Sequence, residues 1–258
     1  MCVTGPGKRL FVAAGTYSAE TTGEVFPLIV RGHAVEGRPD GGAVTVIGLG
    51  PSADGDVTFL VEPAGSLNQL KDLEIVSPSS GAGTGILVRD GATSSDTLVQ
   101  GVGVSDFGTG LVATGGAKLV SVSSGDFVGN GTGIRTEGNV LAQLTANRIE
   151  NGGSGLRILG SSVVQVRSNT IRDNSAQNVE VESSGADLGA VGAPGNNTIQ
   201  GAGGVNIWNR SGGTVPAVGN TLDAGRLTDQ ANEDETDPAH NIANEPGGCI
   251  ELSGSDCP

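Results

Sequence analysis

A four-residue motif, Gly83-Thr84-Gly85-Ile86, is repeated three more times along the middle of the chain. The later copies are Gly108-Thr109-Gly110-Leu111, Gly131-Thr132-Gly133-Ile134 and Gly153-Ser154-Gly155-Leu156. Weaker copies at Gln177-Asn178-Val179 and Gly203-Gly204-Val205 extend the series, and the first apolar residues of the units lie 25, 23, 22, 23 and 26 residues apart. A period in the low twenties with short, glycine-bounded β-branched runs is typical of a β-solenoid.

Composition agrees with a solenoid, because the 258 residues include 45 Gly but only one Trp and one Tyr. Such a chain lacks the residues for many long amphipathic helices or a large aromatic core, and a solenoid needs neither. We expect one all-β β-helix domain over 1–224, with an N-terminal cap within 1–62 and about seven or eight repeat turns over 57–224. Residues 225–258 are predicted to form an acidic C-terminal tail or cap.

The repeat units align position by position. In the first strand of each unit, alternate residues are predicted to face the core, because successive side chains of a strand point to opposite faces. These pairs are Ile86/Val88, Leu111/Ala113, Ile134/Thr136, Leu156/Ile158, Val179/Val181 and Val205/Ile207. A third strand aligns as Phe127, Ile149, Ile171, Ile199 and Leu222.

An asparagine column precedes the third strand at Asn147, Asn169, Asn197 and Asn220. Asparagines at one corner of successive turns can stack their amides about 4.8 Å apart and bond otherwise unpaired backbone groups. We therefore predict a structural ladder, and expect Asn169→Ala to lower the melting temperature more than Asn209→Ala.

The outward face of the first strand offers a binding candidate. Arg135, Arg157 and Glu180 are predicted to share one column, and Glu182 and Trp208 to lie in the neighbouring one with Arg89 and Glu137. A mixed-charge stripe with an indole can bind a sugar chain, since the ring packs on an apolar sugar face and the charges take hydroxyls. The same charges also serve simply to keep an exposed sheet soluble.

The third strand offers a catalytic candidate set of Asp126, Arg148 and Arg167. Asp126 and Arg148 share one outward position, and Arg167 lies slightly upstream on the following unit. General acid–base chemistry would require these groups to be opposed at hydrogen-bond reach.

Charge and residue counts exclude several functions. The net charge of −14 disfavours nucleic acid and anionic membrane surfaces, and also a polyuronate substrate. Two His and no CxxC pair leave no predicted metal site or cofactor, although the acidic run 229–238 could coordinate calcium. No apolar run is long enough to span a bilayer.

Three cysteines bear on location. Cys249 and Cys257 enclose a short loop and are predicted to form a disulfide, as in an exported protein. Cys2 could carry a lipid anchor, or be an ordinary thiol.

Both ends of the chain resemble a family of secreted bacterial proteins headed by a domain of unknown function, within the pectate-lyase-like superfamily. The resemblance rests on Phe11-Val12-Ala13-Ala14-Gly15-Thr16-Tyr17 and Glu24-Val25-Phe26-Pro27-Leu28 near the start, and on Gly195-Asn196-Asn197-Thr198-Ile199 and Gly219-Asn220-Thr221-Leu222 near the end. It implies a single-stranded, right-handed parallel β-helix. It also implies that any catalysis would run along an outward groove, with Arg or Lys as the base in lyases.

The favoured interpretation is a non-catalytic, secreted or cell-surface bacterial protein that contacts carbohydrate or another surface component. A polysaccharide lyase or glycoside hydrolase acting along the third strand is the first alternative, and a structural spacer is the second.

Overall fold

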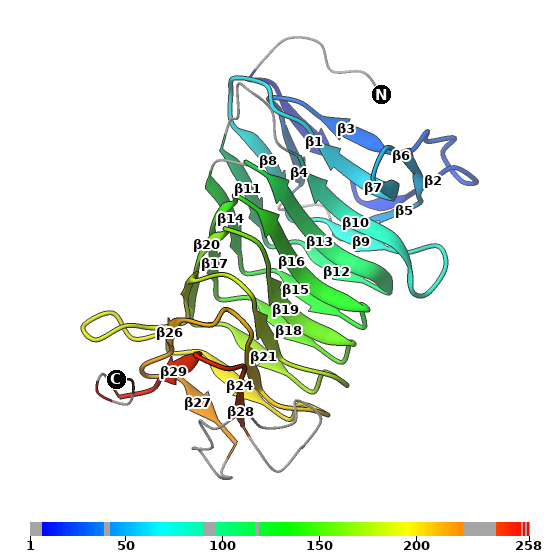
Figure 1. Ribbon diagram of the computed structural model, residues 1–258. Helices are drawn as coiled ribbons and strands as arrows, with labels where there is room; N and C mark the ends of the chain where they lie inside the picture. Colours follow the sequence, from blue (N-terminus) through cyan, green and yellow to red (C-terminus); the bar gives the residue numbers. More distant parts are fainter. Residues whose placement is uncertain are drawn as a thin grey trace.

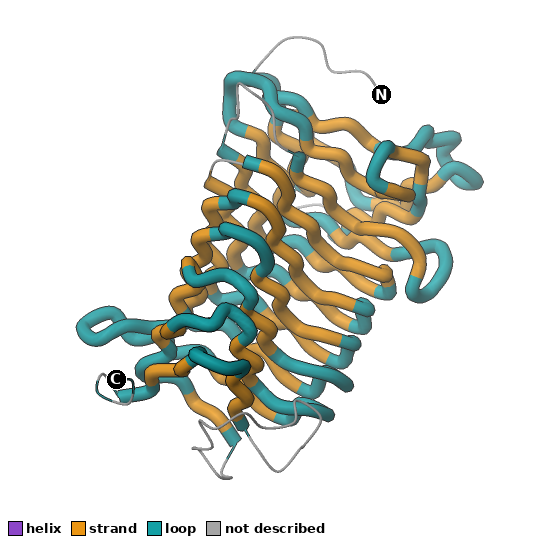
Figure 2. The backbone as a smooth tube through the Cα atoms, in the orientation of Figure 1, coloured by secondary structure: helices purple, strands orange, loops and turns teal. Residues whose placement is uncertain are grey.

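The short β-branched runs form strands, and the glycine- and asparagine-rich segments between them turn the chain through three corners per repeat. The computed structural model describes residues 7–38, 42–89, 96–116, 119–223, 241–253, 255 and 257. In these residues the chain winds into a parallel β-helix of about eight turns, as the repeats predict, and no helix is present. Figures 1 and 2 show the strands stacked along one axis into an elongated prism with the two ends of the chain at opposite ends.

Sheet I contains the glycine-repeat strands and is parallel throughout its main path. Its strands are β3 (Leu28–Val30), β7 (Gly55–Val61), β10 (Ala82–Val88), β13 (Phe107–Gly115), β16 (Thr132–Gly138), β19 (Ser154–Ile158), β22 (Val179–Val181), β25 (Ile207–Asn209) and β28 (Ile242–Asn244). The short β6 (Gly50–Ser52) pairs antiparallel with β7.

Sheet II follows sheet I in each turn. Its strands are β1 (Arg9–Val12), β4 (Ala34–Gly37), β8 (Asn68–Lys71), β11 (Thr97–Gln100), β14 (Leu119–Ser123), β17 (Leu141–Thr145), β20 (Val163–Arg167) and β23 (Gly185–Asp187). Beyond β23, β26 (Thr214–Pro216) and β29 (Cys249–Glu251) form a two-stranded parallel sheet.

Sheet III closes each turn. Its strands are β2 (Gly15–Ser18), β5 (Val44–Ile47), β9 (Glu74–Val76), β12 (Gly103–Ser105), β15 (Asp126–Val128), β18 (Arg148–Glu150), β21 (Thr170–Arg172), β24 (Thr198–Gln200) and β27 (Thr221–Leu222).

Both end regions of the described chain contribute regular strands to the β-helix. The N-terminal region expected to include a cap already supplies β1, β2 and β3 to the three sheets, so turns of the β-helix begin at Arg9. At the other end, β28 and β29 continue the stacking, and Cys249 and Cys257 form a disulfide with their Cα atoms 5.9 Å apart. Cys2 and the acidic run 229–238 lie outside the described residues.

The core consists of aliphatic columns inside the prism. Phe59, Ile86, Leu111, Ile134, Leu156 and Val179 are in register along sheet I and nearly fully buried. Each is stacked on identical or similar side chains above and below, so apolar area is buried along the axis and every turn depends on its neighbours.

The second glycine of each repeat lies inside the strand, although the sequence indicates a turn glycine. A Cβ atom on Gly133 would collide with Cγ2 of Ile149, and one on Gly155 with Cγ2 of Ile171. Both glycines have ordinary negative φ values, so it is this close approach to the sheet III core column that requires them.

Candidate functional site: the outer faces of sheets I and III

Two faces of the prism carry the candidate residues. On sheet I, the outward column reads Arg135, Arg157, Glu180 and Trp208 in register. The sequence alignment was wrong for Trp208: Val179 pairs with Ile207 and Glu180 with Trp208, so the indole stands in the Arg157 column and not beside Glu182. The segment from Ile199 to Ile207 is as long as the segment from Ile171 to Val179, but the alignment began the strand two residues early, at Val205, which is buried and precedes β25.

Glu180 is the centre of an ion-pair network on sheet I. Its side chain is nearly inaccessible and accepts from Arg157 Nε at 2.5 Å and from Arg210 Nη1 at 2.7 Å. Arg210 also bonds Glu182 at 2.7 Å and Glu245 at 3.0 Å. The hydrogen bond to Glu180 is the largest of the effects that raise the pKa of Arg210, so this guanidinium stays charged.

Trp208 lies against the same guanidinium. The Arg210 Cζ atom is 4.4 Å from the centroid of the indole, a cation–π contact, and the indole is half-buried. Arg210 therefore orients the ring while its three carboxylate partners fix the guanidinium. Sequence reasoning did not single out Arg210, although it follows Trp208 by two residues and so lies on the same face.

Arg135 stands apart from this network. Its Nε lies 3.3 Å from Glu137 Oε2, and the geometry leaves that buried nitrogen without a hydrogen bond. Arg135 and Arg157 are in register, but Arg135 forms an ion pair with Glu137 and Arg157 with Glu180. The two ends of the predicted stripe are therefore separate groups.

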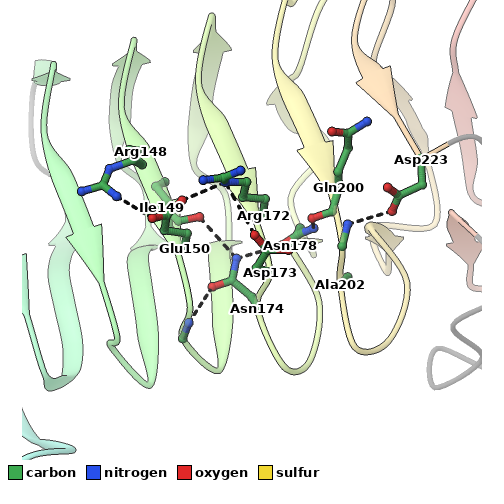
Figure 3. Close-up of polar contacts among 12 residues, drawn as sticks. Arg148, Ile149, Glu150, Arg172, Asp173, Asn174, Asn178, Gln200, Ala202 and Asp223 are labelled. Atoms are coloured by element: carbon green, nitrogen blue, oxygen red, sulfur yellow. Dashed lines mark hydrogen bonds and ion pairs between the residues drawn. The ribbon is translucent and has the colours of Figure 1, made fainter.

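On sheet III, Asp126 and Arg148 are brought together as predicted from their shared position. Arg148 Nε donates to Asp126 Oδ1 at 2.8 Å, and Nη1 donates to Glu150. Glu150 is buried and also accepts from Arg172 Nε at 2.8 Å, so Figure 3 shows its carboxylate between two guanidinium groups. The hydrogen bond to Asp126 is the largest of the effects that raise the pKa of Arg148. The hydrogen bond to Glu150 is the largest of those that raise the pKa of Arg172.

Arg167 belongs elsewhere. It is the last residue of β20 in sheet II, and its guanidinium bonds the carboxylate of Asp187 at 2.5 Å and the Asp187 carbonyl oxygen at 2.8 Å. No contact joins it to Asp126 or Arg148 within the described part of the chain. The corner between sheets II and III separates them, so Asp126, Arg148 and Arg167 are not one constellation.

Glu74 is a further acidic residue of sheet III. In its column, Glu74, Gly103 and Asp126 follow one another on successive turns. The Glu74 side chain bends over Gly103, where a Cβ atom would collide with Oε2. Although Glu74 is exposed as a whole, partial burial of its carboxyl group, followed by the nearby charge of Asp126, raises its pKa.

Asparagine ladders support both faces. Asn147 Nδ2 donates to Asn169 Oδ1 at 2.9 Å, Asn169 to Asn197 at 3.1 Å, and Asn197 to Asn220 at 2.8 Å. Each oxygen also accepts the backbone N–H of the preceding asparagine, as Asn169 Oδ1 does from Asn147 N at 2.9 Å. These bonds satisfy polar groups at the corner between sheets II and III, where Asn147, Asn169 and Asn197 are buried.

A second ladder occupies the corner between sheets III and I. Asn174, Asn178, Asn206 and Asn241 are joined by amide–amide bonds of 2.7, 2.6 and 2.6 Å, the first of which is drawn in Figure 3. Asn206 also donates to Asp223 at 2.9 Å. The irregular spacing of these asparagines hid the ladder from the repeat alignment.

Among the described residues, no cluster of three or more His, Cys, Asp or Glu could hold a metal ion, and no helix is long and apolar enough to cross a membrane.

The fold and these ion-paired faces define a repeat protein of the parallel β-helix class. The chain belongs to the family described as "Protein of unknown function (DUF1565)", whose sequence model matches residues 1–227. No curated protein matches the chain. Among solved structures, a mutant of the periplasmic alginate epimerase AlgG shares 12% identity with a TM-score of 0.45, covering 95% of this chain and 84% of that one.

Proposed function

We propose that this chain is a non-catalytic extracellular or cell-surface protein that binds carbohydrate on the outer face of sheet I, around Trp208. The observation that carries the proposal is the indole stacked on Arg210, beside Glu182 and Glu245. Sugar sites combine an aromatic surface for the apolar face of the ring with fixed polar groups for the hydroxyls. The sugar ring would pack on the part of the Trp208 indole that Arg210 does not cover.

The charge pattern favours a neutral polysaccharide. Nine of the ten described arginines take part in an ion pair, Arg38 being the tenth, so few cationic groups are left to neutralise a uronate. With a net charge of −14, the surface repels a polyanion. The disulfide between Cys249 and Cys257 supports export, because such bonds persist in oxidising compartments.

Binding to immobilised polysaccharides and a glycan array tests this proposal. Trp208→Ala is expected to weaken binding at least tenfold, and Trp208→Phe to retain part of it. Val163→Ala, on the outer face of sheet II with 48% exposure, is the control for removing an exposed apolar side chain. Failure to bind any polysaccharide, or equal effects of Trp208→Ala and Val163→Ala, would overturn the proposal.

The second candidate function is glycoside hydrolysis on sheet III. It is favoured by the position of the Glu74 carboxyl group over Gly103. A protonated Glu74 could give its proton to the glycosidic oxygen while Asp126 takes one from the attacking water, and the bond from the anomeric carbon to the leaving oxygen breaks. The raised pKa of Glu74 supports the acid role. A lyase with Arg148 as its base is disfavoured, because the pKa of that arginine is raised.

A reducing-sugar assay distinguishes the two functions. New reducing ends that disappear in both Glu74→Gln and Asp126→Asn, with Trp208→Ala still active, would replace the binding proposal by an enzyme. Absorbance at 235 nm, the signal of an unsaturated lyase product, is not expected in either case.

A further inference from the structure

The two ends of the β-helix differ in charge. Among the described residues, 7–38 contain four Lys and Arg against three Glu, whereas 223 and 241–257 contain Asp223, Glu245 and Glu251 and no Lys or Arg. The first strands of the sheets and the last ones lie at opposite ends of the prism (Figure 1). One end of the molecule is therefore electrostatically suited to meet the other end of a second molecule.

A column of charges runs along sheet I between these ends. It consists of the residue after Val30 and of the residues at the same position on the following turns, with Thr114 and Leu159 as its two uncharged members: Arg31, Glu62, Arg89, Thr114, Glu137, Leu159, Glu182, Arg210 and Glu245. Opposite charges bond between neighbours, as between Arg31 and Glu62 and between Arg210 and Glu245. The column begins with an arginine and ends with a glutamate.

Both terminal members have accessible side chains. The side chain of Arg31 is 62% exposed and that of Glu245 is 45% exposed, and within the described residues each has its ion-pair partner on the side that faces the body of the β-helix. Arg31 has Glu62 beneath it, and Glu245 has Arg210 above it. Each could accept an oppositely charged group on its outer side.

Among the described residues, the first turn also has open strand edges and an exposed apolar side chain. Among the described strands, β1, β2 and β3 each have a neighbour on one side only, as do β27 and β28 at the other end. Ile29 on β3 is 58% exposed, although the next residues of its column, Leu60 and Leu87, are buried. Open strand edges of this kind pair with other strands unless they are covered.

We propose that the N-terminal end of this β-helix docks on the C-terminal end of a second copy, so that sheet I continues from β28 of one molecule to β3 of the next. In that arrangement Arg31 lies beside Glu245 of the next copy, and the alternation of charge runs on across the junction. Ile29 then lies next to Ala243 of the next copy in the same column, and its side chain becomes buried. The contact joins two different surfaces, so it propagates into linear chains of molecules.

Sedimentation velocity of the full chain over a range of concentration and NaCl tests the proposal. The chain should self-associate at low salt and dissociate as salt rises, because the charge interaction is screened. Arg31→Glu and Glu245→Arg should each weaken self-association at least tenfold, since the junction then joins like charges. Lys71→Glu on sheet II makes the same charge change as Arg31→Glu away from the column and should leave association within about threefold.

Mixing the two variants is the decisive measurement. Arg31→Glu carries a glutamate at both junction positions and Glu245→Arg an arginine at both, so each alone should associate weakly and the mixture should associate again. In a contact between two N-terminal ends, Glu245→Arg alone would not weaken association. A wild-type monomer at every salt and concentration, no restoration on mixing, or equal effects of Arg31→Glu and Lys71→Glu would overturn the proposal.

Discussion

Asn169 accepts two hydrogen bonds from Asn147 on a single side-chain oxygen, one from the backbone N–H and one from the side-chain amide, both 2.9 Å long. Its own amide donates to the carbonyl oxygen of Leu144 at 2.9 Å and to Asn197 at 3.1 Å. The residue thus connects three successive turns at a corner that is closed to water. The stability of the β-helix should depend on it more than on an ordinary turn residue.

Asn169→Ala should lower the free energy of unfolding by about 2–4 kcal/mol, because it leaves both buried donors of Asn147 without their acceptor. Chemical denaturation followed by circular dichroism measures the change. Asn209, the comparison suggested by the sequence, is unsuitable because it is buried and bonds Asn244 at 3.1 Å. Asn139→Ala at an exposed position is the matched control, and equal losses in the two variants would contradict a special role for the ladder.

Ala146→Gly should stabilise the chain, although the substitution removes a side chain. Ala146 has a φ of 55°, in the left-handed region that a Cβ atom disfavours by roughly 1–2 kcal/mol, and it is exposed. Part of the gain is offset by the greater freedom of glycine in the unfolded state, so about 0.5–1 kcal/mol is expected.

Thermal unfolding of Ala146→Gly beside Ala142→Gly checks this assignment. Ala142 is buried in β17 with an ordinary φ, so its substitution should destabilise. A loss of stability in both variants would show that the corner does not strain Ala146.

Thr136→Val should raise the free energy of unfolding by about 1 kcal/mol. Thr136 faces the core of sheet I with 1% exposure, and its hydroxyl has no hydrogen-bond partner, so a methyl group of similar size removes a buried unsatisfied polar atom. Thr145→Val on the outward face of sheet II provides the control, since its hydroxyl is exposed to solvent. A stability loss at Thr136 would reveal a partner for the hydroxyl, such as a buried water.

The sequence predicted the fold well where one residue type recurs at one spacing. The aliphatic columns of sheets I and III follow from Ile86, Leu111, Ile134 and their counterparts, because every turn buries the same position. The alignment failed at Trp208, because it began the strand at Val205, an apolar residue two positions ahead of Ile207. Counting from Ile199 on sheet III, as from Ile171 to Val179, would have placed Ile207 in register.

The candidate sites were harder to predict than the fold. The pairing of Asp126 with Arg148 follows from their shared position on adjacent turns, but that of Arg167 with Asp187 depends on which side of a corner each residue lies. A difference of one or two residues at such a corner transfers a side chain to another sheet. The bend of Glu74 over Gly103 depends on a missing side chain one turn away, which only the register reveals.

The free energy of unfolding of Glu74→Gln should rise relative to that of the parent chain as the pH increases. The folded state raises the pKa of Glu74, first through partial burial of the carboxyl group and then through the charge of Asp126, so folding favours the protonated form. A raised pKa contributes stability that is present below the unfolded-state value and is lost as the pH rises through the folded-state value. Glutamine mimics the protonated form and cannot lose that contribution.

Unfolding free energies of Glu74→Gln and the parent chain, measured from about pH 4 to pH 7, should therefore diverge in favour of the variant as the pH increases. Glu20→Gln, at an exposed position of the first turn, measures the general effect of removing one negative charge from a chain with a net charge of −14. If both variants gain equally, the effect belongs to the overall charge of the surface, and the acid role of Glu74 in the hydrolysis candidate loses its physical basis. If only Glu74→Gln gains, the surroundings of the carboxyl group above Gly103 raise its pKa, which is the direction that a general acid on sheet III requires.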